Sequence, residues 1–151
     1  CSNVCAAYVR DIYLKQGGFE KKTIFNEDMI YAAGLIQSGY EVSYEAQARV
    51  IHSHNYSALQ QFHRNFDLAV SQSDHAEIFD AVPSEKEGIR MVMSTVSYLI
   101  RVGKAYLIPE LIWQSGWKYL GYFLGKRYRH LPKKIVLCCS MNKKYWQDKN
   151  F

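Results

Sequence analysis

The chain has 151 residues, of which 48% are hydrophobic and 22% charged, and its formal net charge is +5. This length suits one domain of ordinary size with a substantial core, and the composition excludes disordered and collagen-like chains. The sequence shows no signal peptide and no apolar run of about 18 residues, so we expect neither secretion nor a membrane-spanning segment.

The charge is divided unevenly along the chain. Residues 1–100 carry 8 Lys or Arg and 12 Asp or Glu, whereas residues 101–151 carry 11 and 2. All three tryptophans lie in or near the basic part, at positions 113, 117 and 146. Basic residues interleaved with aromatic ones are typical of contact with an anionic membrane or a nucleic acid. Nucleic acid is disfavoured because the acidic part would repel it, so we expect no nucleic-acid partner.

The four cysteines, Cys1, Cys5, Cys138 and Cys139, have no spacing that indicates a disulfide or metal framework. We therefore expect free thiols in a reducing cytoplasm.

In the first third of the chain, the pattern predicts mixed structure. A strand is predicted at residues 2–8, followed by a helix at 10–16 that Gly17 and Gly18 close. A second helix starts at Glu27 and stops at Gly39, and two strands follow at 41–44 and 48–51. The second of these strands leads directly into His52. Residues 1–56 are therefore predicted to form a compact α/β unit.

After residue 56 the pattern predicts helices alone. They span 57–70 with Ser57 as the N-cap, 84–102 ended by Gly103, 109 to 125 or 128, and 132–138. We therefore predict an all-helical extension at residues 57–151. On the helix from 109, Leu111, Ile112, Leu120 and Leu124 are expected to pack inward. Aromatic residues on such a helix more often belong to a core than to a membrane contact. A set that is harder to bury together, and that suits a helix lying on a membrane surface, comprises Trp113, Trp117 and Tyr128 with Lys118, Lys126, Arg127 and Arg129.

Glu27 and Asp28 open an apolar helix, where backbone N–H groups and the helix dipole favour negative charge. A carboxylate kept ionised there can accept a proton, and the acids can equally do no more than complement the dipole. His52 and His54 follow a predicted strand end, where an imidazole can bind a metal or phosphate or merely end the strand. In an extended segment both rings face the same side, so either is a candidate ligand.

An ordered series of short motifs runs through the chain. It comprises residues 2–8, Gly17-Gly18-Phe19, Asn26-Glu27-Asp28, residues 48–54, 62–66 and 116–125. The series resembles the second half of the catalytic domain of family 2 glycosyltransferases, which has the GT-A fold, and especially bacterial rhamnosyltransferases. The resemblance implies the C-terminal half of a GT-A domain followed by a helical extension. The N-terminal nucleotide-binding half of such enzymes carries an Asp-x-Asp motif, and none occurs here. We therefore expect a fragment that is inactive alone.

The resemblance also implies roles for single residues. Asp28 would be the general base of an inverting sugar transfer, and Glu27 would shape the acceptor site. His52, or alternatively His54, would help to hold Mg²⁺ or Mn²⁺ on the donor diphosphate. Asn3 would border the acceptor cleft, unless it is only a turn or edge residue.

Arg10 and Arg64 are further substrate-binding candidates, because a guanidinium group matches phosphate oxygens, although both also suit a plain surface position.

The expected partners follow from the same resemblance. The donor would be a nucleotide sugar, with dTDP-L-rhamnose as the leading candidate, and the acceptor a lipid-linked or growing surface polysaccharide. The expected location is the cytoplasm, peripheral at the inner face of the cell membrane. The alternative is a non-catalytic basic helical module that docks on a membrane surface or a protein partner.

Overall fold

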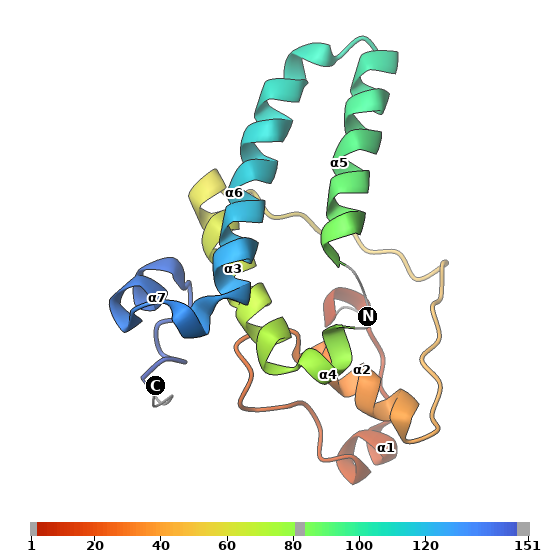
Figure 1. Ribbon diagram of the computed structural model, residues 1–151. Coiled ribbons are helices and arrows are strands. Elements are labelled where there is room, and N and C mark those ends of the chain that lie inside the picture. The colour runs from red at the N-terminus through yellow and green to blue at the C-terminus, as the bar shows by residue number, and fades with distance from the viewer. Residues whose placement is uncertain (1–2, 81–83, 148–151) are drawn as a thin grey trace. The chain divides into compact units, whose positions relative to one another are not determined.

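The computed structural model describes residues 3–80 and 84–147. The chain divides into two compact units, Cys1–Asn55 and Tyr56–Phe151, which are described separately below. Figure 1 shows their helices along the chain.

In the first unit, two helices and a cluster of aromatic rings form the core. A short 3-10 helix, η1 (Asn3–Cys5), precedes α1 (Arg10–Lys15) and α2 (Glu27–Gln37). The rings of Tyr8, Tyr13, Phe19 and Tyr31 contact one another, with centroids 5.2–6.2 Å apart. Gly18 has a φ of +75°, and a Cβ there would meet the ring of Tyr13, so the turn that ends α1 needs glycine.

The α/β fold predicted for residues 1–56, as half of a GT-A domain, is wrong. The structure has no strand within residues 3–80 and 84–147. Residues 3–5 form a 3-10 helix, residue 2 lies outside the described residues, and segments 41–44 and 48–51 are irregular. Tyr44 and Ile51 in these segments are fully exposed or nearly so. A strand needs a neighbouring backbone for its hydrogen bonds, and alternating apolar residues alone do not supply one.

The second unit contains the remaining helices: α3 (Ala58–Asp74), α4 (Ala76–Phe79), α5 (Ser84–Arg101), α6 (Ile108–Lys126) and α7 (Lys133–Cys139), with 3-10 turns η2 (Ala105–Leu107) and η3 (Tyr128–His130). The helices predicted after residue 56 are confirmed. Ser57 caps α3 as expected: its hydroxyl accepts the Gln60 N–H, and the Gln60 side chain accepts the Ser57 N–H at 2.8 Å.

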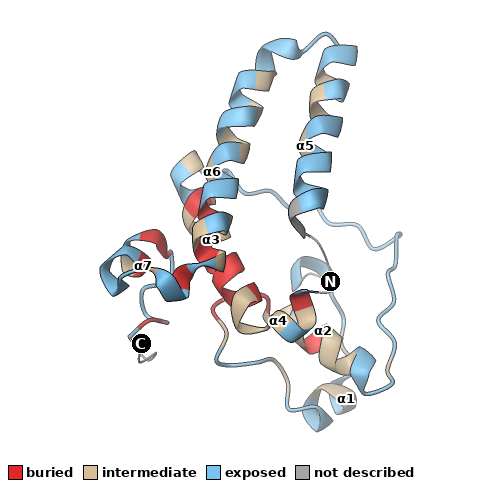
Figure 2. Cartoon of the chain, in the orientation of Figure 1, coloured by how far each residue is buried: buried red, intermediate tan, exposed pale blue. Residues whose placement is uncertain are grey.

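Among the described helices of this unit, α3 carries the most buried residues, as Figure 2 shows. Phe66, Ala69 and Val70 are fully buried. The main partner of α3 is α6, whose backbone approaches at two glycines. A Cβ at Gly121 would strike the carbonyl oxygen of Phe62, and one at Gly125 would strike that of Phe66. The two helices can therefore pack this closely only where α6 has no side chain.

A buried carboxylate fixes the segment after α7 to α3. One oxygen of Asp67 accepts the N–H groups of Met141 and Asn142 at 2.9 and 3.1 Å. Burial raises the pKa of Asp67 above its ordinary value, although these bonds and the hydroxyl of Ser140 act in the opposite direction. His63 adds a contact from α3, because its Nδ1 lies 2.7 Å from the carbonyl oxygen of Cys139.

Helices α5 and α6 form an antiparallel hairpin joined by η2 (Figure 1). Most of α5 is exposed, and so is the first half of α6 (Figure 2). Ile112 and Leu120 were predicted to pack inward, but they are 58% and 44% exposed. Tyr128 was predicted to face a membrane, but it is buried with Trp146, and the two ring centroids are 5.6 Å apart.

Within the described residues, no helix combines the length and the apolar character needed to cross a membrane.

The glycine contact gives a first prediction. Gly121→Ala should lower the free energy of unfolding by about 1–3 kcal/mol, because the new methyl group forces α6 away from the Phe62 carbonyl. The matched control is Gly116→Ala on the same helix, where a Cβ meets nothing within 4 Å. There, alanine should stabilise the helix by up to about 1 kcal/mol. Urea unfolding followed by circular dichroism measures both effects. Equal stability of the two variants would contradict the close crossing.

Candidate functional site

The acid pair lies at the start of α2, behind a residue with an unusual backbone. Asn26 has a φ of 62°, in the left-handed region that asparagine tolerates better than most residues, and it is buried. The helix begins directly after it, so Glu27 and Asp28 occupy the first turn. Both side chains are partly buried. Their charges therefore lie beside the N–H groups of the first turn, which have no acceptor within the helix itself.

Asn3 meets this acid pair from η1. Its backbone N–H donates to Asp28 Oδ2 at 2.9 Å, and its side-chain amide donates to Glu27 Oε1 at 3.4 Å. The hydroxyl of Tyr8 donates to Asn3 Oδ1 at 2.6 Å. The structure thus brings together three of the predicted site residues, and it adds Tyr8, which was not predicted as a site residue. The sequence feature that could have indicated Tyr8 is its place in the same motif as Asn3, at residues 2–8.

The environment of Tyr8 keeps its hydroxyl protonated. Burial raises the pKa of Tyr8 above its ordinary value of 10.0, and the negative charges of Asp28 and Glu27 raise it further. Tyr8 can therefore act as a hydrogen-bond donor at neutral pH and hold the amide of Asn3 in place.

The carboxylate of Asp28 is held through both of its oxygens. Oδ2 accepts the Asn3 N–H, and Oδ1 accepts the Met29 N–H at 2.8 Å. Each carboxylate oxygen has a second acceptor position that these bonds leave open. A carboxylate fixed in this way can accept a proton from a hydroxyl group placed beside it.

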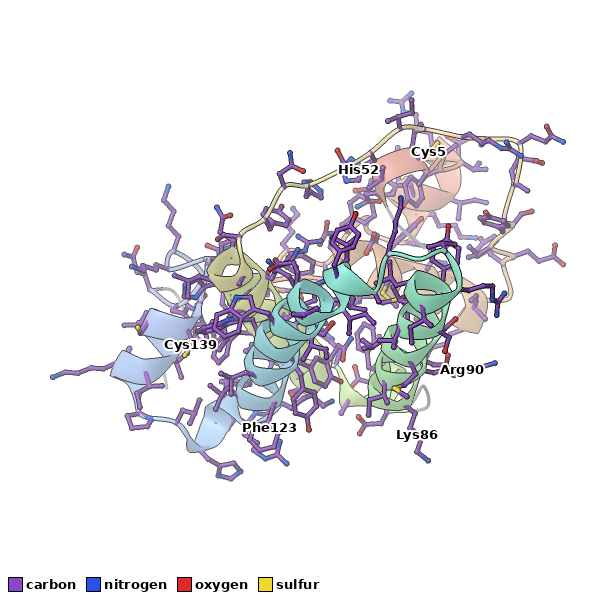
Figure 3. The ribbon with its side chains drawn as sticks, turned by 90° about the horizontal axis from the view of Figure 1, so that it is seen from above. Cys5, His52, Lys86, Arg90, Phe123 and Cys139 are labelled. Atoms are coloured by element: carbon purple, nitrogen blue, oxygen red, sulfur yellow. The ribbon has the colours of Figure 1, made fainter. Side chains whose placement is uncertain are left out.

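His52 and His54 lie on the irregular segment that follows α2, and both are exposed. Figure 3 labels His52 on this segment. Their ring centroids are 4.2 Å apart and the ring planes are perpendicular. In the part of the chain that the structure describes, no group of three or more His, Cys, Asp or Glu side chains is arranged to hold a metal ion. The two imidazoles alone do not fit the coordination sphere of Mg²⁺ or Mn²⁺, which takes about six ligands, mostly oxygen.

The two predicted arginines belong to different units of the chain. Arg10 is the first residue of α1 in the first unit and is exposed. Arg64 belongs to the second unit, where its guanidinium carbon lies 5.7 Å from the centroid of the Tyr56 ring. A cation over a ring face is a common stabilising contact.

A cavity of about 400 Å³ lies beside α2. Its lining combines the turn after α1 with the helix residues Ile30, Tyr31, Gly34 and Leu35. Glu27 and Asp28 do not line it. The predicted acid site and this cavity are therefore separate features of the first unit, and the hydrogen-bonded acid pair carries the clearer chemistry.

Two curated proteins are similar to this chain over 148 residues, which is 97% of its length. "O-antigen chain rhamnosyltransferase WbaN" of Salmonella anatum is 40% identical, and "O-antigen chain rhamnosyltransferase RfbN" of Salmonella typhimurium is 39% identical. The matched region is 47% of each relative, so the chain spans about half the length of the curated relatives it matches. No family model matches the chain. No solved structure matches it either.

The electrostatic effect of the acid pair on Tyr8 is testable by titration. Asp28→Asn removes a negative charge near the phenol, so it should lower the pKa of Tyr8, while the increase caused by burial persists. NMR of the chain labelled with ¹³C-tyrosine measures this pKa. Glu45→Gln, which neutralises an exposed acid of the same unit, is the matched control and should leave it unchanged. An unchanged Tyr8 pKa in Asp28→Asn would show that the carboxylate is not beside the phenol.

Proposed function

We propose that this chain is part of a bacterial rhamnosyltransferase that builds a cell-surface polysaccharide. The similarity to two proteins named O-antigen chain rhamnosyltransferases, over nearly the whole chain, supports the proposal. The observation that carries its chemistry is the carboxylate of Asp28, held at a helix start by the backbone of Asn3.

The proposed reaction is the inverting transfer of rhamnose from a nucleoside-diphosphate donor, with dTDP-L-rhamnose as the leading candidate. An acceptor hydroxyl attacks the anomeric carbon from the face opposite the diphosphate. Asp28 takes the hydroxyl proton as the new C–O bond forms, and the bond to the diphosphate oxygen breaks. A single carboxylate suffices, because the diphosphate leaves as an anion and needs no proton, unlike the alkoxide in a glycoside hydrolase. The acceptor would be a lipid-linked or growing saccharide.

The neighbours of Asp28 would act through position. Asn3 donates to both acids, so it fixes the separation between Glu27 and Asp28. Tyr8 holds the oxygen of the Asn3 amide, so the amide nitrogen faces Glu27. Glu27 is left to accept a hydrogen bond from a second hydroxyl of the acceptor. In this proposal Asp28 takes the proton. The acceptor is oriented by Glu27, and the two acids are positioned by Asn3 and Tyr8.

We place the two histidines on the donor side as a hypothesis. A protonated or neutral imidazole can donate a hydrogen bond to a diphosphate oxygen, and His52 and His54 offer two rings 4.2 Å apart. The divalent cation, Mg²⁺ or Mn²⁺, stays a proposal as well. Because two imidazoles do not complete its coordination sphere, we assign it no step of the reaction. Arg10 and Arg64 stay candidates for the same anionic donor.

The role of Asp28 is tested in the full-length natural protein. Asp28→Asn keeps the shape and an acceptor oxygen but cannot take the proton, so it should lower kcat by about 10²–10⁴-fold. Donor affinity and thermal stability should change little. Glu45→Gln is the control and should keep normal turnover. If Asp28→Asn kept near-normal turnover, Asp28 would not be the base, and the acid pair would only complement the helix dipole.

The donor-side hypothesis predicts a different kinetic pattern. His52→Ala should weaken nucleotide-sugar binding, measured by calorimetry, while kcat at saturating donor falls less than in Asp28→Asn. The same measurement on His54→Ala decides between the two rings. If neither substitution changes donor affinity, the histidines have no part in the donor site, and the assignment of Asp28 is unaffected.

A further inference from the structure

The hairpin of α5 and α6 exposes apolar side chains on both helices. On α5, Ile89, Met93 and Ile100 are exposed, and their spacings of four and seven residues place them on one helix face. The turn adds Tyr106, which is 74% exposed, and α6 adds Trp113, which is 58% exposed. Exposed apolar residues scattered singly are ordinary, but a continuous surface of them indicates an interaction site.

A groove on α6 is part of this surface. It has a volume of about 660 Å³ and an almost wholly apolar lining: Ile108, Pro109, Ile112, Trp113, Gly116, Trp117 and Leu120. The C-terminal part of the same helix packs on α3 at Gly121 and Gly125. The groove therefore lies on the part of α6 that precedes the contact with α3, and it shares the exposed Trp113 with the apolar surface of the hairpin.

The charges around the surface are mostly positive. Every charged residue between positions 91 and 109 is a cation: Arg101 ends α5, and Lys104 lies in the turn of the hairpin. Lys118 adds a further exposed cation on α6, and Glu110 is the sole acid between residues 88 and 127. Such a surface attracts an anionic partner. A second copy of the same hairpin would bring cations against cations and is disfavoured.

We propose that the α5–α6 hairpin docks on the surface of an anionic phospholipid bilayer, with its turn at residues 102–107 among the head groups. Tyr and Trp prefer the boundary between water and hydrocarbon, and adjacent Lys and Arg pair with lipid phosphates. The hairpin exposes this combination at its turn and along α6. The burial of Tyr128 and Trp146 moves the docking surface away from the C-terminal end of the chain. The proposal does not depend on sugar transfer.

The test measures binding of the 151-residue chain to vesicles by flotation. Vesicles of phosphatidylcholine alone are compared with vesicles that also contain phosphatidylglycerol. We expect binding to the anionic vesicles, and a marked loss of it at molar salt, where the Debye length shrinks to about 3 Å.

Two sets of variants separate the electrostatic and apolar parts. Arg101→Gln with Lys104→Gln should lower the partition coefficient by about 25-fold, since each cation near the surface contributes about fivefold. Lys143→Gln with Lys144→Gln is the matched control, because it removes the same charge from exposed positions outside the hairpin. It should change binding less than the hairpin pair does. Tyr106→Ser with Trp113→Ser should weaken binding and leave its salt dependence unchanged.

Three outcomes would overturn the proposal. One is equal binding to neutral and anionic vesicles. Another is an equal loss of binding in the hairpin pair and in the control pair. The third is a dimer in sedimentation velocity without lipid that Trp113→Ser dissociates, because the surface would then be an interface between copies. Circular dichroism of each variant, with the helix content of the parent chain, ensures that a loss of binding is not a loss of fold.

Discussion

The backbones of α3 and α6 touch at Gly121 and Gly125, and the arrangement of the second unit depends on this contact. Because α6 has no side chain at these positions, the carbonyl oxygens of Phe62 and Phe66 lie directly against it. The close approach buries the face of α3 that carries Ala69 and Val70. Dispersion attraction and apolar burial both increase as two helices approach. The two glycines therefore allow a tightly packed core that contains few large side chains.

The helices could be predicted because their signals are local. The prediction of strands was wrong because a strand depends on a second segment of backbone. Ser57 forms its own capping box, and Gly103 has the positive φ expected of a residue that ends a helix. Residues 41–44 and 48–51 have the apolar alternation of strands, but their form depends on a partner backbone, which no pattern within the segment can supply. The glycine crossing was visible as Gly-x-x-x-Gly at 121–125, yet its meaning depends on which helix lies opposite.

The candidate site was partly predictable for a similar reason. Glu27 and Asp28 were placed by the helix start, which is a local feature, and the resemblance indicated Asn3 nearby. The hydrogen bond from Tyr8 to Asn3 depends on the aromatic cluster that positions the ring, a property of the folded unit. The histidines were expected at a strand end, but they lie on an irregular, exposed segment. Orientation of a side chain on such a segment follows no sequence period.

The glycine contact also has a mechanical consequence. Helix α6 has 19 residues, so at about 1.5 Å per residue it extends about 28 Å. It is clamped to α3 near its C-terminal end and largely uncovered near its N-terminal end. At Gly121 and Gly125 the backbones of α6 and α3 are in direct contact, and α6 has no flexible side chain there that could adjust to a movement of the helix. A displacement of the turn of the hairpin would therefore be passed to α3 through the carbonyl groups of Phe62 and Phe66, which lie against the two glycines.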